Sequence, residues 1–267
     1  MKLFALILCL TSSLFAKSSY HDLYDQFPEV MGRLGSWKQG EIEITTNPSE
    51  IKKIENHCYQ RLLRKGYSSE EAKQYSQVGI VAEDQYWMWV RDAVYFPGGV
   101  MGTYERIFWK TGLLGPSGAV ILPVINNTKV VVNINFRHAT RSWELELPRG
   151  GRNLEESAEE AAVRELKEET GCLVNKLTLL GSMAPDSGII GGTVPVYLGT
   201  VNKRTPRQQD ESEAIALNLE VSVQELKEAF IKSYLIIDIK GKKTKVYCRD
   251  PYLSFALLQA TWQKLIY

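Results

Sequence analysis

The acidic residues near the middle of the chain have a spacing that can bind a cation. Glu165 and Glu169 are four residues apart, and Glu168 is three residues from Glu165, so on a helix all three carboxylates lie near one face. Like charges at this spacing repel each other, and a divalent cation removes the repulsion. The group contains no His or Cys, and carboxylate oxygens suit Mg²⁺ or Mn²⁺ better than Zn²⁺. The spacing therefore predicts a Mg²⁺ or Mn²⁺ site, against the alternative of an ordinary solvated acidic helix.

The residues around these acids predict a helix that packs on a sheet. Ser157 is followed three residues later by a glutamate, which is a capping box, and Gly171 supplies a left-handed stop. Arg164 is placed to reach Glu168 along the helix or Glu156 before it, and so to orient a metal ligand. The small and apolar residues that would face the sheet are Ala158, Ala161, Ala162 and Leu166.

The elements before this helix form an extension and a set of aromatic strands. Residues 41–47 alternate like a strand, and helical spacing predicts helices at about 48–66 and 68–79. Aromatic, β-prone runs at 86–95 and 104–109 flank a Pro-Gly-Gly turn, which is typical of a hairpin.

The remaining elements predict an α+β domain with a mixed sheet, because strands flank helices without regular βαβ alternation. Ser222 caps a helix through Tyr234, and Asp250 with Pro251 begins a final helix. Further strands are predicted at 119–125 and 129–136 around Asn126-Asn127, and at 143–147, 177–181, 194–201 and 217–221.

The stretch from Gly150 to Cys172 resembles the box of the Nudix hydrolases: Gly, five residues, Glu, seven residues, then Arg-Glu-aliphatic-any-Glu-Glu-any-Gly-aliphatic. The one departure is Cys172, where a bulky aliphatic residue is usual. The resemblance implies a mixed β-sheet between helices, preceded by an N-terminal helical and β extension. The matching residues are Gly150, Glu156, Arg164, Glu165, Leu166, Glu168, Glu169 and Gly171.

The same resemblance implies hydrolysis of a pyrophosphate bond by a metal-polarised water. Glu165 and Glu169 would be the main metal ligands, Glu168 a further one, and the carbonyl of Arg149 or Gly150 a backbone ligand. Arg164 is also part of the box, and the resemblance implies that it is one of the catalytic residues.

Features outside the box resemble the ADP-ribose pyrophosphatase branch of this superfamily. The run from Trp143 to Gly151 is similar to that branch's approach to the box, which implies that Glu146 lies near the metals. Arg137 stands where the branch grips substrate phosphate, with an ordinary surface arginine as the alternative. Pro185 comes earlier than a proline often found in that branch.

The resemblance also implies a general base and an aromatic contact. Glu213, or failing it Glu211, stands where the branch has a catalytic glutamate, and a mobile acidic loop is the alternative. Trp89 is a candidate to stack on adenine, although core packing also explains such a residue.

The substrate expected from this branch is a small molecule linked to a nucleoside diphosphate, with ADP-ribose first. Nucleotide sugars and dinucleoside polyphosphates are the alternatives, as are a non-catalytic binding module of the same fold and a secreted scaffold with a merely acidic helix. A homodimer is expected by the same analogy.

The net charge and the first residues of the chain bear on its ligands and on its compartment. The 267 residues include 32 basic and 31 acidic ones, a net charge of +1, which does not indicate binding to nucleic acid or anionic membranes. Residues 1–16 resemble a signal peptide too short to span a bilayer, so we expect export to the periplasm or beyond, or a cytoplasmic protein if the segment is not a signal.

The expected domain organisation is an extension at 17–84 followed by the Nudix domain at 85–267, which consists of antiparallel strands (85–113) and a core (114–267). Cys58, Cys172 and Cys248 are expected to be buried free thiols.

Overall fold

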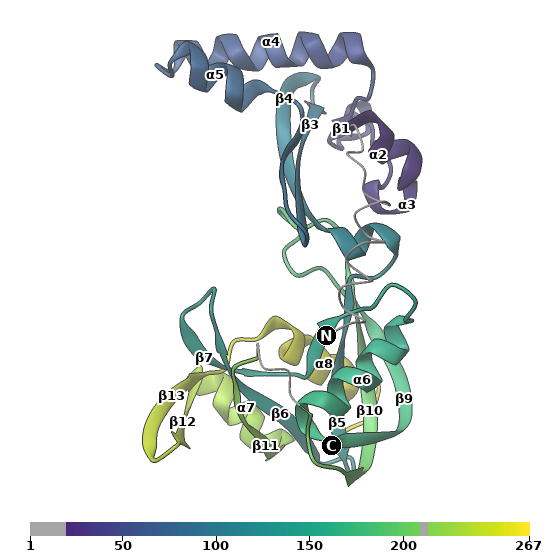
Figure 1. Ribbon diagram of the computed structural model, residues 1–267, viewed down its shortest axis with the longest axis vertical. Helices are drawn as coiled ribbons and strands as arrows, with labels where there is room; N and C mark the ends of the chain where they lie inside the picture. The colour runs from purple at the N-terminus through teal and green to yellow at the C-terminus, as the bar shows by residue number, and fades with distance from the viewer. Residues whose placement is uncertain (1–19, 209–212) are drawn as a thin grey trace, which may run out of the picture. The chain divides into compact units, whose positions relative to one another are not determined.

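A computed structural model describes residues 20–208 and 213–267 of the chain (Figure 1). The chain divides into two units. The first unit holds the described residues up to Leu113 together with Asp186–Gly191, and the second holds Leu114–Pro185 and Gly192–Tyr267. The predicted signal peptide at 1–16 and the candidate base Glu211 lie outside the described residues. Within the described ranges, no helix has the length and apolar character needed to cross a bilayer.

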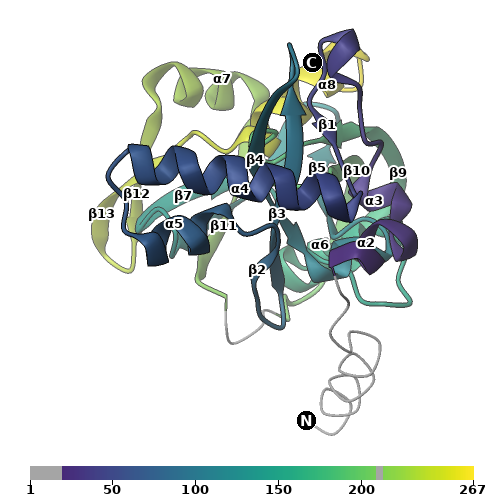
Figure 2. The same cartoon turned by 90° about the horizontal axis from the view of Figure 1, so that it is seen from above.

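The first unit is a small antiparallel sheet with helices packed on it. Strand β3 is central, because β4 pairs along its whole length while β1 and β2 share its other edge. Helix α4, with α5 beside it, lies across these strands (Figure 2). The elements are α2 (Tyr20–Gln26), α3 (Pro28–Met31), η1 (Trp37–Gln39), β1 (Glu43–Ile44), α4 (Pro48–Arg64), α5 (Ser69–Ser76), β2 (Gly79–Glu83), β3 (Trp87–Phe96), β4 (Val100–Trp109) and η2 (Lys110–Leu114).

Most of the predicted elements of this unit are confirmed. The two helices at 48–66 and 68–79 correspond to α4 and α5, and the aromatic hairpin corresponds to β3 and β4. The strand expected at 41–47 was too long, since only Glu43–Ile44 pair with β3. The structure adds α2, α3 and β2, whose short runs carry no clear periodicity in the sequence. It also joins β2 and β3 in one sheet, although the expected boundary between the extension and the Nudix domain, at residue 84, falls between these two strands. The domain boundaries themselves stay predictions.

A buried polar cluster holds α2 and α3 on this sheet. Asp92 on β3 is 1% exposed, and its carboxylate accepts hydrogen bonds from the hydroxyls of Tyr20 and Tyr24 at 2.9 and 2.6 Å. Arg106 on β4 donates its Nε to Asp92 at 2.8 Å and its Nη1 to the carbonyl of Met31 at 2.9 Å. Asp92 thus links α2 to the hairpin, and its partner Arg106 links α3 to it.

The second unit is a mixed sheet of nine strands. The order along the sheet is β12-β13-β7-β6-β5-β10-β9, with β11 also paired to β6 and β8 to β5. The pairs β5–β10 and β7–β13 are parallel, and the other pairs are antiparallel. The strands are β5 (Gly118–Ile125), β6 (Lys129–Arg137), β7 (Ser142–Glu146), β8 (Arg149–Gly151), β9 (Cys172–Met183), β10 (Val194–Arg204), β11 (Ile215–Ser222), β12 (Tyr234–Ile239) and β13 (Lys242–Tyr247).

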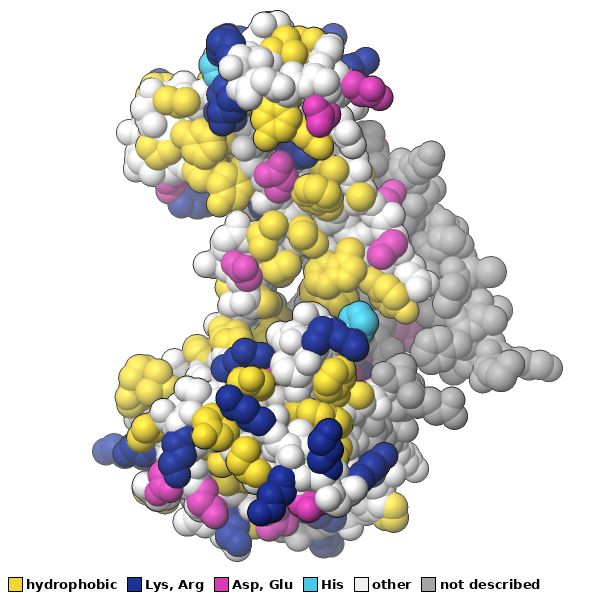
Figure 3. Space-filling model, turned by 90° about the vertical axis from the view of Figure 1, so that its left-hand side faces the viewer, with side chains coloured by type: hydrophobic (Ala, Val, Ile, Leu, Met, Phe, Trp, Pro, Cys, Tyr) yellow, Lys and Arg dark blue, Asp and Glu magenta, His cyan; other side chains and the backbone are white. Residues whose placement is uncertain are grey.

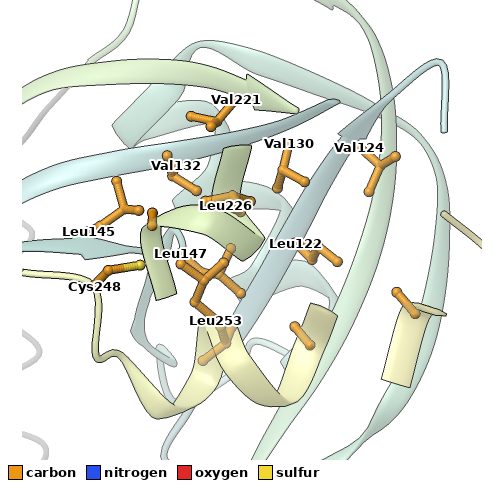
Figure 4. Packing of buried hydrophobic residues seen from close by; sticks show 14 of the residues in the cluster. Leu122, Val124, Val130, Val132, Leu145, Leu147, Val221, Leu226, Cys248 and Leu253 are labelled. Carbon is orange, nitrogen blue, oxygen red and sulfur yellow. The ribbon is translucent and has the colours of Figure 1, made fainter. Parts of the chain in front are cut away.

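Helices cover both faces of this sheet. Helix α6 (Ala158–Thr170) packs on one face, and α7 (Val223–Lys232) and α8 (Pro251–Trp262) pack on the other. Strand β5 shows the alternation: Ile121 contacts the α6 side, whereas Leu122 belongs to the cluster formed with α7 and α8 (Figure 4). The predicted α+β fold, a mixed sheet between helices, is confirmed.

The predicted contact residues of α6 are also confirmed. The side chains expected to face the sheet are all buried in one cluster with β5, β6 and β10, namely Ala158, Ala161, Ala162 and Leu166. Ser157 forms the expected capping box, and Gly171 ends the helix in the left-handed conformation with φ 72°. The small alanines let the helix backbone approach the sheet closely.

Several boundaries differ from the sequence expectation. The helix expected to run through Tyr234 ends at Lys232, because Ser233 takes a left-handed conformation with φ 64°. Tyr234 instead begins the hairpin of β12 and β13, which the pattern did not predict. The short strand β8 at the start of the box was not predicted, and the strand expected at 177–181 extends over the whole of β9. The three cysteines are buried and free, as predicted.

Replacing Asp92 with Ala tests the buried cluster of the first unit. The change leaves the Arg106 guanidinium, whose side chain is 21% exposed, without its partner carboxylate. We expect urea unfolding to show a loss of about 3 kcal/mol, the scale for breaking a buried ion pair. The control is Lys53→Ala, which removes an exposed pair with Glu50 and should change stability little. Equal stability of Asp92→Ala and the unchanged protein would contradict the role given to this cluster.

Candidate active site

Three carboxylates of the second unit converge on one point. Glu165 and Glu169 come from α6, and Glu213 precedes β11. One oxygen of each lies within 4.8 Å of the others. Glu165 and Glu169 are 6% and 4% exposed, and Glu213 is half-buried. The donor set consists of oxygens only and lies close enough for a hard divalent cation to bind several members together.

Burial and mutual repulsion change the acidity of these groups. The pKa of Glu169 rises to about 9, first because burial disfavours its charge and then because the charges of Glu213 and Glu165 repel it. Burial also raises the pKa of Glu165, although Arg164 opposes this. A divalent cation bound at this cluster would favour the ionised form of these carboxylates.

Gly150 makes room for one of these carboxylates. A Cβ added at Gly150 would lie 2.1 Å from the carboxyl carbon of Glu165, whereas at Gly151 the nearest atom would be 3.9 Å away. Strand β8 pairs with β5 at this position, so the backbone of Gly150 is held in place. The first glycine of the box is therefore required by the Glu165 side chain.

Arg164 ties the carboxylates of the helix to the segment before it. Its Nε and Nη2 donate to Glu156 at 2.8 and 3.0 Å, and its Nη1 donates to Glu165 at 2.6 Å and Glu168 at 2.9 Å. The Nη2 also donates to the carbonyl of Gly151 at 2.8 Å. The predicted reach to Glu168 and Glu156 is confirmed. Glu168 is the most exposed of these partners, with a side chain 39% exposed.

Two asparagines that the sequence analysis missed position Glu169. Asn133 on β6 is 2% exposed and donates its Nδ2 to Glu169 Oε2 at 2.6 Å. Asn218 on β11 donates its own Nδ2 to Asn133 Oδ1 at 2.8 Å and to the Glu169 carbonyl at 3.2 Å. A local signal for Asn133 was available, because Asn is disfavoured within strands and Asn133 lies between three valines and Ile134.

A second group of charges adjoins the cluster through Arg149. Its backbone N–H donates to Glu169 Oε2 at 3.3 Å, and its guanidinium binds Glu146 at 2.9 Å and Asp250 at 2.6 Å. Arg137 binds the same Glu146 at 2.7 Å. Glu146 is thus one contact away from the carboxylate cluster. Arg137 has 38% of its side chain exposed, and its predicted role toward phosphate stays a prediction.

The end of α6 is tied to the segment that leads toward Glu213. A Cβ at Gly171 would lie 1.9 Å from the carbonyl of Thr205. The backbone N–H of Thr205 donates to the Gly171 carbonyl at 2.7 Å, and that of Gln208 donates to the Glu168 carbonyl at 2.9 Å. The box glycine at 171 thus serves both the helix stop and this close chain contact.

Trp89, the candidate for adenine stacking, belongs to the first unit and is not part of the cluster in the second. It is 38% exposed and lines an open pocket with Trp87, Ile107 and Ile190. Its stacking role stays a prediction.

Comparison with known proteins finds a family model that matches the part of the chain with this site. Residues 116–237 match the family model of the NUDIX domain. Over 95 residues the chain is 27% identical to a Nudix hydrolase of Schizosaccharomyces pombe, covering 36% of this chain and 46% of that protein. Over 112 residues it is 29% identical to the ADP-ribose pyrophosphatase of Bacillus subtilis, covering 41% of this chain and 60% of that protein. The chain thus spans only about half of the length of these relatives.

A solved structure, that of an ADP compounds hydrolase, shares the fold with a TM-score of 0.52 and 22% identity, covering 70% of this chain and 92% of that one. The residues that match the family model, 116–237, contain the whole carboxylate helix and Glu213. The carboxylate site therefore lies in the part of the chain that matches the NUDIX domain, and the match to the ADP-ribose pyrophosphatase agrees with the branch expected from the sequence.

Replacing Gly150 with Ala should damage the metal site without unfolding the protein. The three atoms nearest to the new methyl group all belong to the Glu165 carboxylate, at the end of a side chain that can shift. We expect Mn²⁺ affinity, measured by isothermal titration calorimetry, to fall about tenfold or more. The matched control is Gly151→Ala, which has open space and should bind Mn²⁺ normally. Unchanged Mn²⁺ affinity in Gly150→Ala would remove Glu165 from the ligand set.

The raised pKa of Glu169 predicts how metal-free stability depends on pH. The folded protein keeps this proton up to about pH 9, whereas the ordinary pKa is 4.5. Between these values the folded state binds more protons than the unfolded chain, so the free energy of unfolding falls as pH rises. Thermal unfolding in EDTA should show this fall, and Mg²⁺ should reduce it because the cation favours the ionised form.

The control for this pH dependence is Glu169→Gln, which has no proton to lose at this position. Its melting temperature in EDTA should vary less between pH 5 and pH 9 than that of the unchanged protein. If both proteins show the same slope, the dependence arises from other groups.

Proposed function

We propose that this protein hydrolyses the pyrophosphate bond of a nucleoside diphosphate derivative with Mg²⁺ or Mn²⁺, and that ADP-ribose is its substrate. The observation that carries the proposal is the convergence of Glu165, Glu169 and Glu213 on one point beside the box helix. The likeness to an ADP-ribose pyrophosphatase supports the choice of substrate.

The ligands of the cation would be Glu165 and Glu169, with Glu168 and the carbonyl of Arg149 or Gly150 beside them. When bound, the cation would offset the charge of the diphosphate and lower the pKa of a water molecule. Arg164 holds Glu165 and Glu168 in place, and Asn133 fixes the Glu169 carboxylate through its Nδ2. These contacts orient the oxygens before substrate arrives, so little reorganisation is needed during the reaction.

Glu213 takes the proton of the attacking water in this proposal. Its carboxylate belongs to the cluster but comes from outside the box helix, so it can act on the water while the helix carboxylates hold the cation. Attack on one phosphorus of ADP-ribose breaks the bridging P–O bond and gives AMP and ribose 5-phosphate. Arg137, which is linked to the carboxylate cluster through Glu146 and Arg149, is a candidate to bind a phosphate oxygen of the substrate.

The test measures hydrolysis of the pyrophosphate bond in a panel of compounds in the presence of Mg²⁺. ADP-ribose, ADP-glucose, NADH, diadenosine tetraphosphate and nucleoside triphosphates should be compared by kcat/KM, with ADP-ribose expected to be the best. Glu213→Gln should lower kcat by about 10²-fold or more with a modest change in KM. The control Glu155→Gln alters an exposed acid in the same stretch and should retain the full rate.

Two results would overturn parts of this proposal. Hydrolysis of none of the compounds would favour a binding module with this fold, and full activity of Glu169→Gln would remove Glu169 from the metal ligands that the reaction needs. An unchanged kcat in Glu213→Gln would place the base elsewhere. If ADP-glucose or diadenosine tetraphosphate exceeds ADP-ribose, the reaction type stands and the substrate changes.

A further inference from the structure

The hairpin of β12 and β13 concentrates positive charge that the charge of the whole chain conceals. Residues 234–247 contain four lysines and one acidic residue, a net charge of +3, whereas the complete chain carries +1. Lys and Arg side chains, with hydrophobic ones between them, gather on the side of the second unit where β12 and β13 lie (Figure 3). The four lysines of the hairpin, all exposed, are Lys240, Lys242, Lys243 and Lys245.

The two faces of this hairpin have different compositions, because successive side chains of a strand point to opposite sides. The inner face is apolar and joins the core cluster formed with α7 and α8, through Leu235, Ile237, Ile239 and Val246. The outer face consists of three cross-strand pairs, namely Tyr234 with Tyr247, Ile236 with Lys245, and Asp238 with Lys243. These outer side chains are exposed, except for the half-buried Tyr247.

Ile236 lies at the middle of the outer face with no core to pack against. It is 57% exposed, and Tyr234, two residues earlier on the same side of the strand, is 39% exposed. A single exposed isoleucine needs no explanation, but an apolar centre rimmed by charged residues is typical of an interaction surface. Contact with another apolar phase would remove this side chain from water and so stabilise binding.

The tyrosine rings of the outer face are covered by cations. The Lys245 ammonium lies 4.4 Å from the centre of the Tyr234 ring and 4.8 Å from that of Tyr247, and the Arg249 guanidinium lies 4.4 Å from the Tyr247 ring. Single-stranded nucleic acid is held by bases that stack on free aromatic rings. Lysine and tyrosine, each with an apolar body and a polar tip, instead suit the headgroup level of a membrane. The arrangement therefore favours a lipid surface over a nucleic acid.

The positive charge of the hairpin is available for such a contact. Its one acid, Asp238, accepts a hydrogen bond from the Gly241 N–H at 2.8 Å and so holds the turn. Arg249, just beyond the hairpin, is paired with Glu144 at 2.7 Å and is not needed for the argument. A cluster of about four Lys or Arg residues is attracted by anionic lipid headgroups, and the hairpin alone supplies four lysines.

We propose that the outer face of the β12–β13 hairpin, formed by Tyr234, Ile236, Lys243, Lys245 and Tyr247, docks on an anionic phospholipid surface. Ile236 enters the boundary between headgroups and acyl chains, and the lysines contact the lipid phosphates. The binding is peripheral and needs neither metal nor nucleotide. It goes beyond the proposed hydrolysis and uses none of the residues assigned to that reaction.

The experiment measures co-sedimentation of the full-length protein with vesicles, with EDTA present so that divalent cations cannot bridge protein and lipid. The protein should bind vesicles made of equal amounts of phosphatidylcholine and phosphatidylglycerol, and not vesicles of phosphatidylcholine alone. Binding should weaken as salt is added, because salt screens the charges. Lys243→Gln/Lys245→Gln should lower the partition coefficient about 25-fold, since each lysine near an anionic surface contributes about fivefold.

The control for charge is Lys176→Gln/Lys203→Gln. These two lysines are exposed on β9 and β10, at the other end of the same sheet, and their replacement changes the net charge equally. This control should bind the anionic vesicles like the unchanged protein. Absence of vesicle binding by the unchanged protein, or equal losses in the two double variants, would overturn the proposal.

A second pair of variants tests the apolar contact. Ile236→Ser should weaken binding to the anionic vesicles about fivefold or more, because the isoleucine no longer gains from leaving water. Its control is Leu179→Ser on β9, a position that is 55% exposed and should not affect binding. Both side chains are largely outside the core, so both variants should fold. Unchanged binding by Ile236→Ser would contradict the docked face, since only a diffuse charge effect would then be left.

A fluorescent single-stranded oligonucleotide tests the other polyanion that a basic surface can meet. Its anisotropy should be the same with Lys243→Gln/Lys245→Gln and with Lys176→Gln/Lys203→Gln. If the hairpin variant loses oligonucleotide binding while its vesicle binding is unchanged, the surface binds nucleic acid and the proposal fails.

The vesicle result is independent of the proposed function. In the absence of lipid, kcat/KM for ADP-ribose should be equal in the hairpin variant and the unchanged protein. Loss of the docking proposal would leave the hydrolysis standing, and a failure to hydrolyse ADP-ribose would leave the vesicle result to decide the docking.

Discussion

The constraint on which this site depends is the placing of like charges where water cannot separate them. Glu165 and Glu169 stand one helical turn apart, nearly buried, with Glu213 added from another segment. In water such charges repel weakly, but burial strengthens the repulsion and disfavours each charge by itself. This free-energy cost falls when the carboxylates hold protons or when a cation binds between them. The surrounding structure allows both states.

Close approach of the helix to the sheet makes this arrangement possible. The face of α6 that meets the strands is built from Ala158, Ala161 and Ala162, so the backbones come near each other. That proximity brings Glu169 within reach of Asn133 on β6, and it leaves no room for a side chain at Gly150. The packing of α6 on the sheet therefore also positions the carboxylates. A bulkier residue at the alanine positions would move these carboxylates away from their hydrogen-bond partners.

The sequence predicted the box helix well because its signals are local. The cap at Ser157, the stop at Gly171 and the reach of Arg164 depend on residues within one or two turns of each other. The hairpin of β12 and β13 escaped prediction because only the left-handed Ser233 separates it from a helix. Asn133 and Asn218 were missed for a different reason: an asparagine within a strand is a local signal, but its partners are set by strand pairing between distant segments.

The pair of asparagines also gives the protein a built-in reporter. The Asn218 amide donates to Asn133, and the Asn133 amide donates to Glu169, so the orientation of both amide groups is set by one carboxylate. The side-chain N–H resonances of Asn133 therefore follow the charge on Glu169, although the asparagine belongs to the sheet and not to the carboxylate cluster. Nuclear magnetic resonance of the Asn133 amide can therefore report whether a cation is bound, although Asn133 is not one of the proposed metal ligands.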